Sequence, residues 1–144
     1  MVIAAVASLT VVLDQITKAL AVSELPLGEQ VAVLPFVDLE RTSNSGIAFG
    51  LAGDVPPALL VLLAVAVVVT VILIGSRLRW KYSSLAVGLI LGGAVGNLID
   101  RTTRGSVVDF ISLPHWPTFN LADIAITVGV ALLLLGMLRG RSSG

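Results

Sequence analysis

The chain has 144 residues, of which 56% are hydrophobic and 12% charged, and its formal net charge is zero. Soluble domains carry roughly a quarter of their residues as charges, so this composition predicts one polytopic membrane domain over residues 1–144. The balanced charge indicates no nucleic-acid partner, the absence of cysteine excludes disulfides and thiol chemistry, and a single histidine argues against a histidine-based metal site.

Four apolar stretches are long enough to cross a bilayer as helices, which takes ~20 residues each. The first resembles a secretory signal, but it lacks a basic start and contains Asp14 and Lys18, so a retained helix is favoured. These two residues are four apart, which predicts an ion pair or a hydrogen-bond link to neighbouring helices. A catalytic lysine acting as base to a serine is the alternative. The predicted spans are residues 2–22, 57–74, 84–99 and 121–138.

The segment 23–56, between the first two spans, is predicted to lie outside the bilayer and to contain short strands. Its runs 30–34 and 36–40 are separated by Pro35, and the second alternates apolar with acidic residues. A small outer sheet resting on the bilayer surface is therefore expected. The small residues at 44–50 predict a turn or a short amphipathic helix after it.

The third span combines small residues with polar residues at its outer end. Gly88, Gly92 and Gly96 recur every four residues, a spacing that lets a neighbouring helix approach closely. Asn97 and Arg101 share one helix face and could together hold a phosphate or a peptide carbonyl. The alternatives are a capping role for Asn97 and interfacial snorkelling by Arg101.

The segment 100–120 is the second predicted outer segment, and it leads into the last span. Residues 107–111 have the composition of a strand, whereas Pro114 and Pro117 are expected to stop regular structure. Asn120 is a good N-cap for the last helix, which places Asp123 in its first turn.

Asp109 and Asp123 are the most informative residues, because each lies among apolar neighbours at the end of an element. A carboxylate in or beside hydrocarbon is costly and indicates a functional site. Two carboxyls that share a proton are the machinery of aspartic proteolysis. The hypothesis is that Asp123 is ionised at the helix N-terminus and that Asp109 holds the proton. The alternative is an ordinary strand-edge aspartate and an ordinary helix aspartate, both solvated.

The distribution of Lys and Arg predicts the orientation in the membrane. The loop 75–81 has three cations, and Arg139 and Arg141 follow the last span, whereas the segment 23–56 is acidic. The positive-inside rule then places both termini in the cytoplasm and the two aspartates at the outer face.

Five short motifs, spread over most of the chain, carry a resemblance to a known family. They occur together and in the order found in that family. They are Asp14-Gln15-Ile16-Thr17-Lys18, Asn44-Ser45-Gly46-Ile47-Ala48-Phe49, Gly92-Gly93-Ala94-Val95-Gly96-Asn97-Leu98-Ile99-Asp100-Arg101, Val107-Val108-Asp109-Phe110 and Phe119-Asn120-Leu121-Ala122-Asp123. In these residues the chain resembles lipoprotein signal peptidase, also called signal peptidase II.

The resemblance implies an all-α polytopic membrane protein with four transmembrane helices, a small extracytoplasmic β-sheet (a cradle) and a short outer helix. It implies an intramembrane aspartic endopeptidase of the bacterial cytoplasmic membrane. This enzyme would remove the signal peptide from diacylglyceryl-modified prolipoproteins on the N-terminal side of the lipobox cysteine. Membrane phospholipid and the inhibitory peptide antibiotic globomycin are the further partners implied, and no metal or organic cofactor is expected.

The resemblance also assigns roles to residues. The catalytic pair would be Asp109 and Asp123, and Asp14 matches a position that matters for folding or activity, with Lys18 as its polar neighbour. The residues implied to line the substrate and inhibitor site are Asn44, Gly46, Asn97, Arg101 and Asn120.

Two other functional classes fit parts of the sequence. A transporter or proton relay would use Asp14, Lys18, Asp109 and Asp123 as a polar pathway, but such proteins usually show internal repeats, and none is visible. A small assembly subunit would use the glycine ridge and would leave the two aspartates without a role.

Overall fold

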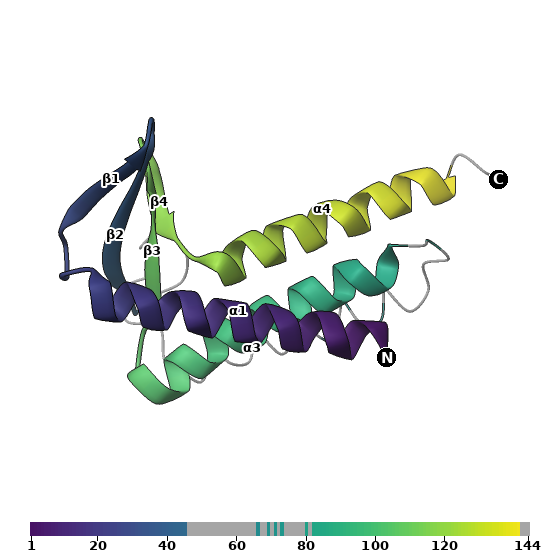
Figure 1. The fold of residues 1–144 in the computed structure, drawn as a ribbon. Coiled ribbons are helices and arrows are strands. Elements are labelled where there is room, and N and C mark those ends of the chain that lie inside the picture. The colour runs from purple at the N-terminus through teal and green to yellow at the C-terminus, as the bar shows by residue number, and fades with distance from the viewer. Residues whose placement is uncertain are drawn as a thin grey trace.

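The computed structural model describes residues 1–45, 66, 69, 71, 73, 80 and 82–141, and within these residues three long helices adjoin a small sheet (Figure 1). Only Ala66, Val69, Val71 and Leu73 of the predicted span 57–74 are described, so that span stays a prediction. The turn or short helix expected at 44–50 lies almost wholly outside the described residues. The elements are α1 Val2–Glu24, β1 Gln30–Leu34, β2 Val37–Asn44, α3 Ser83–Arg104, β3 Val107–Leu113, β4 Trp116–Phe119 and α4 Leu121–Arg141.

The helices α1, α3 and α4 are each long and apolar enough to cross a membrane, and they coincide with three of the four predicted spans. Large apolar side chains on their outer surfaces are exposed, for example Leu9 at 59%, Leu20 at 55% and Leu138 at 62%. Such a continuous apolar surface suits lipid rather than water. The helix α3 continues past the predicted span end at residue 99 to Arg104, in line with the helix face predicted for Asn97 and Arg101, and it stops where Gly105 takes a left-handed conformation (φ 77°).

Close packing by glycine joins the helices, as the spacing predicted. A Cβ atom placed on Gly88 would lie 2.7 Å from the Val6 Cβ, and one on Gly92 would lie 2.5 Å from the Thr10 Cβ, both on α1. On the opposite side of α3, a Cβ on Gly93 would lie 2.5 Å from the Ala122 carbonyl oxygen of α4. The helix α3 is therefore the middle element, in backbone-close contact with both neighbours.

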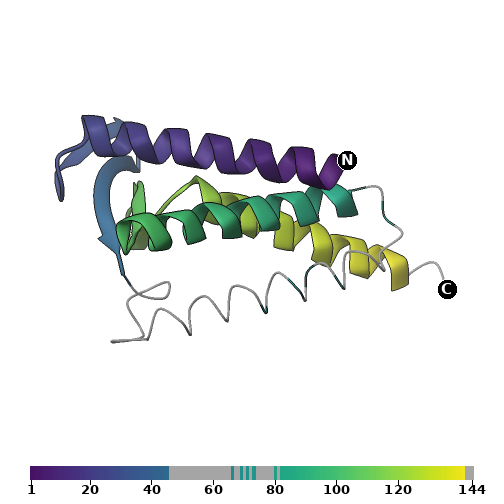
Figure 2. The same cartoon turned by 90° about the horizontal axis from the view of Figure 1, so that it is seen from below.

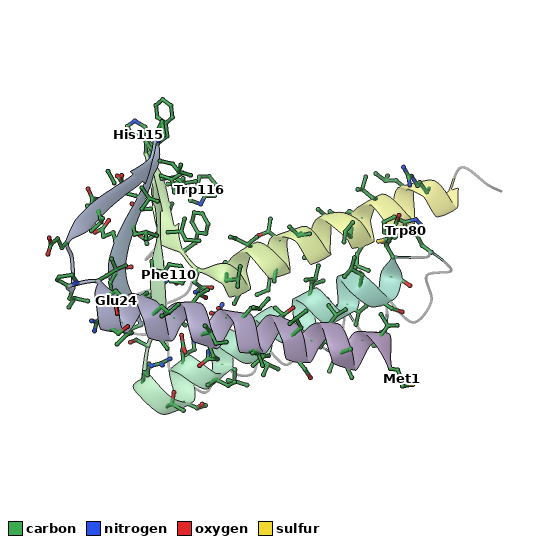
Figure 3. The ribbon with its side chains drawn as sticks, viewed as in Figure 1. Met1, Glu24, Trp80, Phe110, His115 and Trp116 are labelled. Atoms are coloured by element: carbon green, nitrogen blue, oxygen red, sulfur yellow. The ribbon has the colours of Figure 1, made fainter. Side chains whose placement is uncertain are left out.

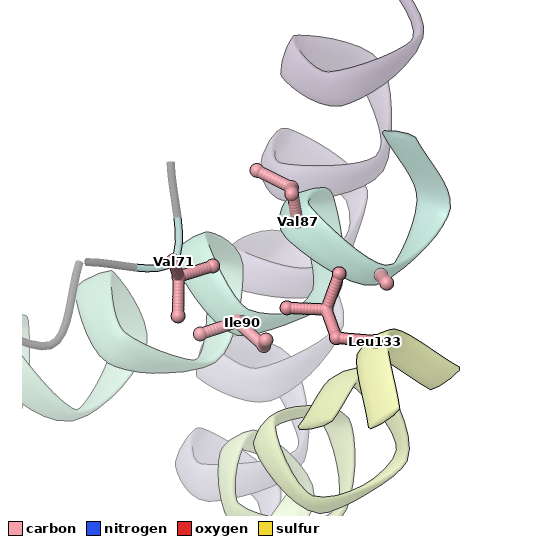
Figure 4. Close-up of a cluster of buried hydrophobic side chains, with 5 residues drawn as sticks. Val71, Val87, Ile90 and Leu133 are labelled. Carbon is pink, nitrogen blue, oxygen red and sulfur yellow. The ribbon is translucent and has the colours of Figure 1, made fainter. Parts of the chain in front are cut away.

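An apolar cluster fills the bundle toward the end that is remote from the sheet. Figure 4 shows Val71, Val87, Ile90 and Leu133 meeting there. Between helices in a bilayer, such side chains contribute by van der Waals packing rather than by removal from water, and they hold α3 against α4.

The four strands form one antiparallel sheet in the order β1-β2-β3-β4. It lies at one end of the bundle, while α1 begins and α4 ends at the other (Figures 1 and 2). The register pairs Thr42 with Asp109 and Asn44 with Val107, so the end of β2 lies beside the start of β3. This pairing brings Asn44 to Asp109 across 65 positions of sequence.

The predicted strands at 30–34 and 107–111 are present, and the one at 36–40 begins at Val37 and continues to Asn44. The expectation that Pro114 would end regular structure is confirmed, because β3 ends at Leu113, but the one for Pro117 was wrong, because Trp116–Phe119 forms β4 around it. The strand β4 is an edge strand, and an edge is where the missing N–H of proline is tolerated.

Candidate active site

Asp109 and Asp123 line the same cavity, which has a volume of about 480 Å³. Asp109 comes from β3 and directly precedes Phe110. Figure 3 shows Phe110 at the end of β3 that lies nearer the helices. Asp123 comes from the first turn of α4. Most of the remaining wall is apolar, with Val107, Leu113, Phe119 and Ile124 among its residues. An apolar cavity with a few convergent polar groups is the usual form of a binding site.

The Asp109 carboxyl is buried, at 3% exposure, and both of its oxygens accept an amide hydrogen bond. The Asn120 Nδ2 donates to Oδ1 at 2.6 Å, and the Asn44 Nδ2 donates to Oδ2 at 3.1 Å. Burial raises the pKa of Asp109 to about 6, and the negative charge of Asp123 acts in the same direction. The two amide donors and the positive charge of Lys18 act against this rise.

Asp123 is held by a reciprocal cap at the start of α4. Its backbone N–H donates to the Asn120 Oδ1 at 3.1 Å, and its Oδ2 accepts the Asn120 backbone N–H at 3.2 Å. Its Oδ1 accepts a hydrogen bond from the Asn97 Nδ2 at 2.9 Å. Asn120 therefore contacts both aspartates, one through its side-chain amide and the other through its backbone.

Lys18 lies behind these residues and is fully buried. Its ammonium donates to the Asn97 Oδ1 at 2.9 Å and forms ion pairs with Asp14 at 2.9 Å and with Asp100 at 3.0 Å. The same Asn97 oxygen accepts from the Asn120 Nδ2 at 3.2 Å. Asp14 and Lys18 thus belong to one polar network that reaches both aspartates.

Two members of this network were missed by sequence reasoning. Asp100 and Gln15 occur in the family motifs but were assigned no role, yet the Gln15 Nε2 lies 3.2 Å from the Asp100 Oδ1. The available signal was Leu98-Ile99-Asp100, an acid that directly follows apolar residues at a span end.

The other predicted site residues are placed less centrally or lie outside the described part. The Arg101 Nη1 donates to the Asn97 carbonyl at 3.4 Å, so it adjoins the network through the α3 backbone. Gly46 lies outside the described residues. Within the described residues, no group of three or more His, Cys, Asp or Glu side chains is arranged to hold a metal ion.

Comparisons with known proteins agree with this architecture. Two solved bacterial membrane enzyme structures match the fold. The first has a TM-score of 0.86 and 28% identity, covering 96% of this chain and 88% of that one. The second has a TM-score of 0.76 and 26% identity, covering 92% and 90%.

Sequence relatives named lipoprotein signal peptidase cover nearly the whole chain. The protein of Syntrophotalea carbinolica is 42% identical over 93% of this chain and 89% of its own length. Those of Brevibacillus brevis and Pseudomonas paraeruginosa are both 43% identical, over 90% and 94% of this chain and 90% and 87% of their own lengths. The family model described as signal peptidase (SPase) II matches residues 6–139. Together, the match over these residues and the identity to these relatives place the chain in the signal peptidase II family.

Proposed function

We propose that the chain is an aspartic endopeptidase that removes the signal peptide from diacylglyceryl-modified prolipoproteins, on the N-terminal side of the lipobox cysteine. The observation that carries this proposal is the pair Asp109 and Asp123, which line one largely apolar cavity and are joined through Asn120. The names of the relatives supply the substrate class, and the two carboxyls supply the chemistry.

In this mechanism the ionised aspartate takes a proton from water, and the protonated aspartate polarises the peptide carbonyl. We assign the proton to Asp109, because burial and the charge of Asp123 raise its pKa to about 6. Asp123 is then the member that takes the proton from water, and its carboxyl is held by the Asn97 amide and the Asn120 backbone N–H.

The neighbouring amides hold the pair in place. Asn44 and Asn120 orient Asp109, and Asn97 orients Asp123. We further propose that Arg101 and Gly46 contribute to the wall that receives the substrate peptide or the inhibitor globomycin.

The setting proposed for this reaction is the outer face of the bacterial cytoplasmic membrane, with both termini in the cytoplasm. In support, α1 begins and α4 ends at the end of the bundle remote from the sheet and the aspartates (Figure 1). A lipid-modified substrate would then approach laterally, with its acyl chains remaining among the membrane phospholipids.

The function is tested with purified protein in phospholipid bilayers and two forms of one prolipoprotein, with and without the diacylglyceryl group. We expect cleavage of the modified form, with the lipidated cysteine as the new N-terminus in mass spectrometry. Equal cleavage of both forms would contradict the substrate assignment, and cleavage of neither would contradict the activity.

The pKa of Asp109 predicts the pH dependence of this activity. Since one carboxyl of the pair must keep its proton, kcat/KM is expected to fall as pH rises through about 6. The hydrogen bond from Asn44 favours the charged form of Asp109, so its loss in Asn44→Ala should raise the pKa of Asp109 further. The alkaline limb of the pH profile should therefore move to higher pH.

The measurement is the pH profile of kcat/KM for both proteins. Gln30→Ala is the control, since it also removes a side-chain amide from the sheet, but one that is exposed and donates to Glu40. A limb that stays in place in Asn44→Ala, or moves to lower pH, would show that Asp109 is not the titrating acid.

A further inference from the structure

Two buried carboxylates, neither of them in the proposed catalytic pair, hold the backbone next to each catalytic aspartate. The Asp14 Oδ1 accepts the backbone N–H of Ala122 at 3.0 Å, and Ala122 directly precedes Asp123. The Asp100 Oδ2 accepts the backbone N–H of Val108 at 3.2 Å, and Val108 directly precedes Asp109. The same contact is thus made twice, once in α4 and once in β3.

One cation joins these two carboxylates. The Lys18 Nζ lies 2.9 Å from the Asp14 Oδ2 and 3.0 Å from the Asp100 Oδ2, and all three side chains have zero exposure. The Gln15 Nε2 also lies 3.2 Å from an oxygen of each carboxylate. The backbone before Asp109 is therefore linked to the backbone before Asp123 through a short chain of buried charged contacts.

We propose that Asp14, Lys18 and Asp100, here called the positioning clamp, set the separation and orientation of the two catalytic aspartates. The clamp rests on the proposed function, since it acts through Asp109 and Asp123 and touches no reacting atom. Its value lies in precise placement, because a misplacement of ~1 Å in a catalytic group can cost about 100-fold in rate.

The third hydrogen bond of Lys18 extends the clamp to a side chain. An ammonium only donates, so its contact with the Asn97 Oδ1 turns the amide nitrogen of Asn97 away from it. That nitrogen faces Asp123 at 2.9 Å. Lys18 thereby selects the amide orientation that supplies a donor to the catalytic carboxylate.

Packing alone does not account for these buried charges. Replacing a buried ion pair with apolar groups of similar size is often neutral or stabilising, whereas removing one partner is strongly destabilising. The single change Lys18→Met would leave the buried Asp14 carboxylate unpaired and Asp100 with Arg104 alone, and it would confound folding with function. The test therefore uses two double variants that keep the charge balanced.

The first variant is Asp14→Asn/Lys18→Met, which removes one charge of each sign and leaves Asp100 with Arg104. The asparagine oxygen can still accept the Ala122 N–H, so α4 keeps its hydrogen bond. Per folded molecule, we expect kcat to fall about tenfold or more with little change in KM. The alkaline limb of its pH profile should move to higher pH. Two charges act on the pKa of Asp109: that of Asp123 on α4, which raises it, and that of Lys18 on α1, which lowers it. The variant keeps the first and removes the second.

The second variant is Asp100→Asn/Arg104→Gln, which leaves Lys18 paired with Asp14. The asparagine oxygen can still accept the Val108 N–H, but the ion pair that ties residue 100 to Lys18 is lost. We therefore expect kcat to fall here as well, but with the alkaline limb unmoved because the charge of Lys18 remains. Thr102→Val is the matched control, because Thr102 is an exposed polar residue on the same helix whose hydroxyl donates to the α3 carbonyls of Leu98 and Ile99. Its kcat and its pH profile should equal those of the parent.

The measurements are the folded fraction, from size-exclusion chromatography and thermal unfolding, and kcat, KM and the pH profile of that fraction. A parental kcat in either folded double variant would overturn the clamp, as would an unmoved limb in Asp14→Asn/Lys18→Met. Failure of both double variants to fold would make the cluster a folding element and would also overturn it. Full activity in Asp109→Asn, measured in the same assay, would instead remove the proposed function.

Discussion

Replacing either Asp109 or Asp123 with Asn is expected to reduce cleavage of the lipidated precursor by about 10²- to 10⁴-fold. Asparagine keeps the size of the side chain but neither takes a proton from water nor donates one as an acid. Both aspartates line the cavity, and each is held by two or more hydrogen bonds. The measurement is the initial cleavage rate of a diacylglyceryl-modified precursor by purified protein in bilayers.

Asp38→Asn is the matched control for this experiment. It is the same chemical change in the same sheet, in β2, and Asp38 does not line the cavity. Its rate should equal that of the parent, and all three variants should remain folded. If both Asp109→Asn and Asp123→Asn cleave the precursor at the rate of the parent protein, the two aspartates are not catalytic.

Gly93→Ala is expected to destabilise the protein by about 1–3 kcal/mol, and to lower activity as well. The new methyl group would lie 2.5 Å from the Ala122 carbonyl oxygen and 2.8 Å from Ile126, so α3 and α4 must move apart. Because the obstacle is a backbone atom, a change of rotamer cannot relieve the clash. Ala122 also precedes Asp123, so the displacement reaches the proposed catalytic pair.

This prediction is measured by thermal unfolding in detergent, followed by the cleavage assay. Val95→Ala, on the exposed side of the same helix at 43% exposure, is the control and should change stability far less. An unfolding temperature of Gly93→Ala equal to that of the parent would show that the helices do not approach this closely.

The aspartates could be predicted from the sequence because a carboxyl among apolar residues is costly unless it has a use. Asp109 and Asp123 both lie in such surroundings. The helix-packing role of Gly88 and Gly92 was predictable for a similar reason, because a four-residue spacing puts small residues on one face.

The network behind the pair was not predictable, because it depends on which helices become neighbours. Asp100 and Gln15 lie 85 positions apart, and nothing local in either segment encodes their contact. The predicted span ends at residue 99 because the apolar run ends there, whereas α3 continues to Arg104, since a helix end outside hydrocarbon can be polar. The strand at Trp116–Phe119 was missed because its tolerance for Pro117 depends on its position at the sheet edge.

The central claim is that the two carboxyls act as one unit on one water molecule, and a double-mutant cycle tests it most directly. The rates to compare are those of Asp109→Asn, Asp123→Asn and the protein with both changes. Residues that act together lose most of the activity at the first substitution, so the double variant should be about as slow as either single variant. A double variant slower by the product of the two single losses would mean that the aspartates act independently, and it would contradict the account.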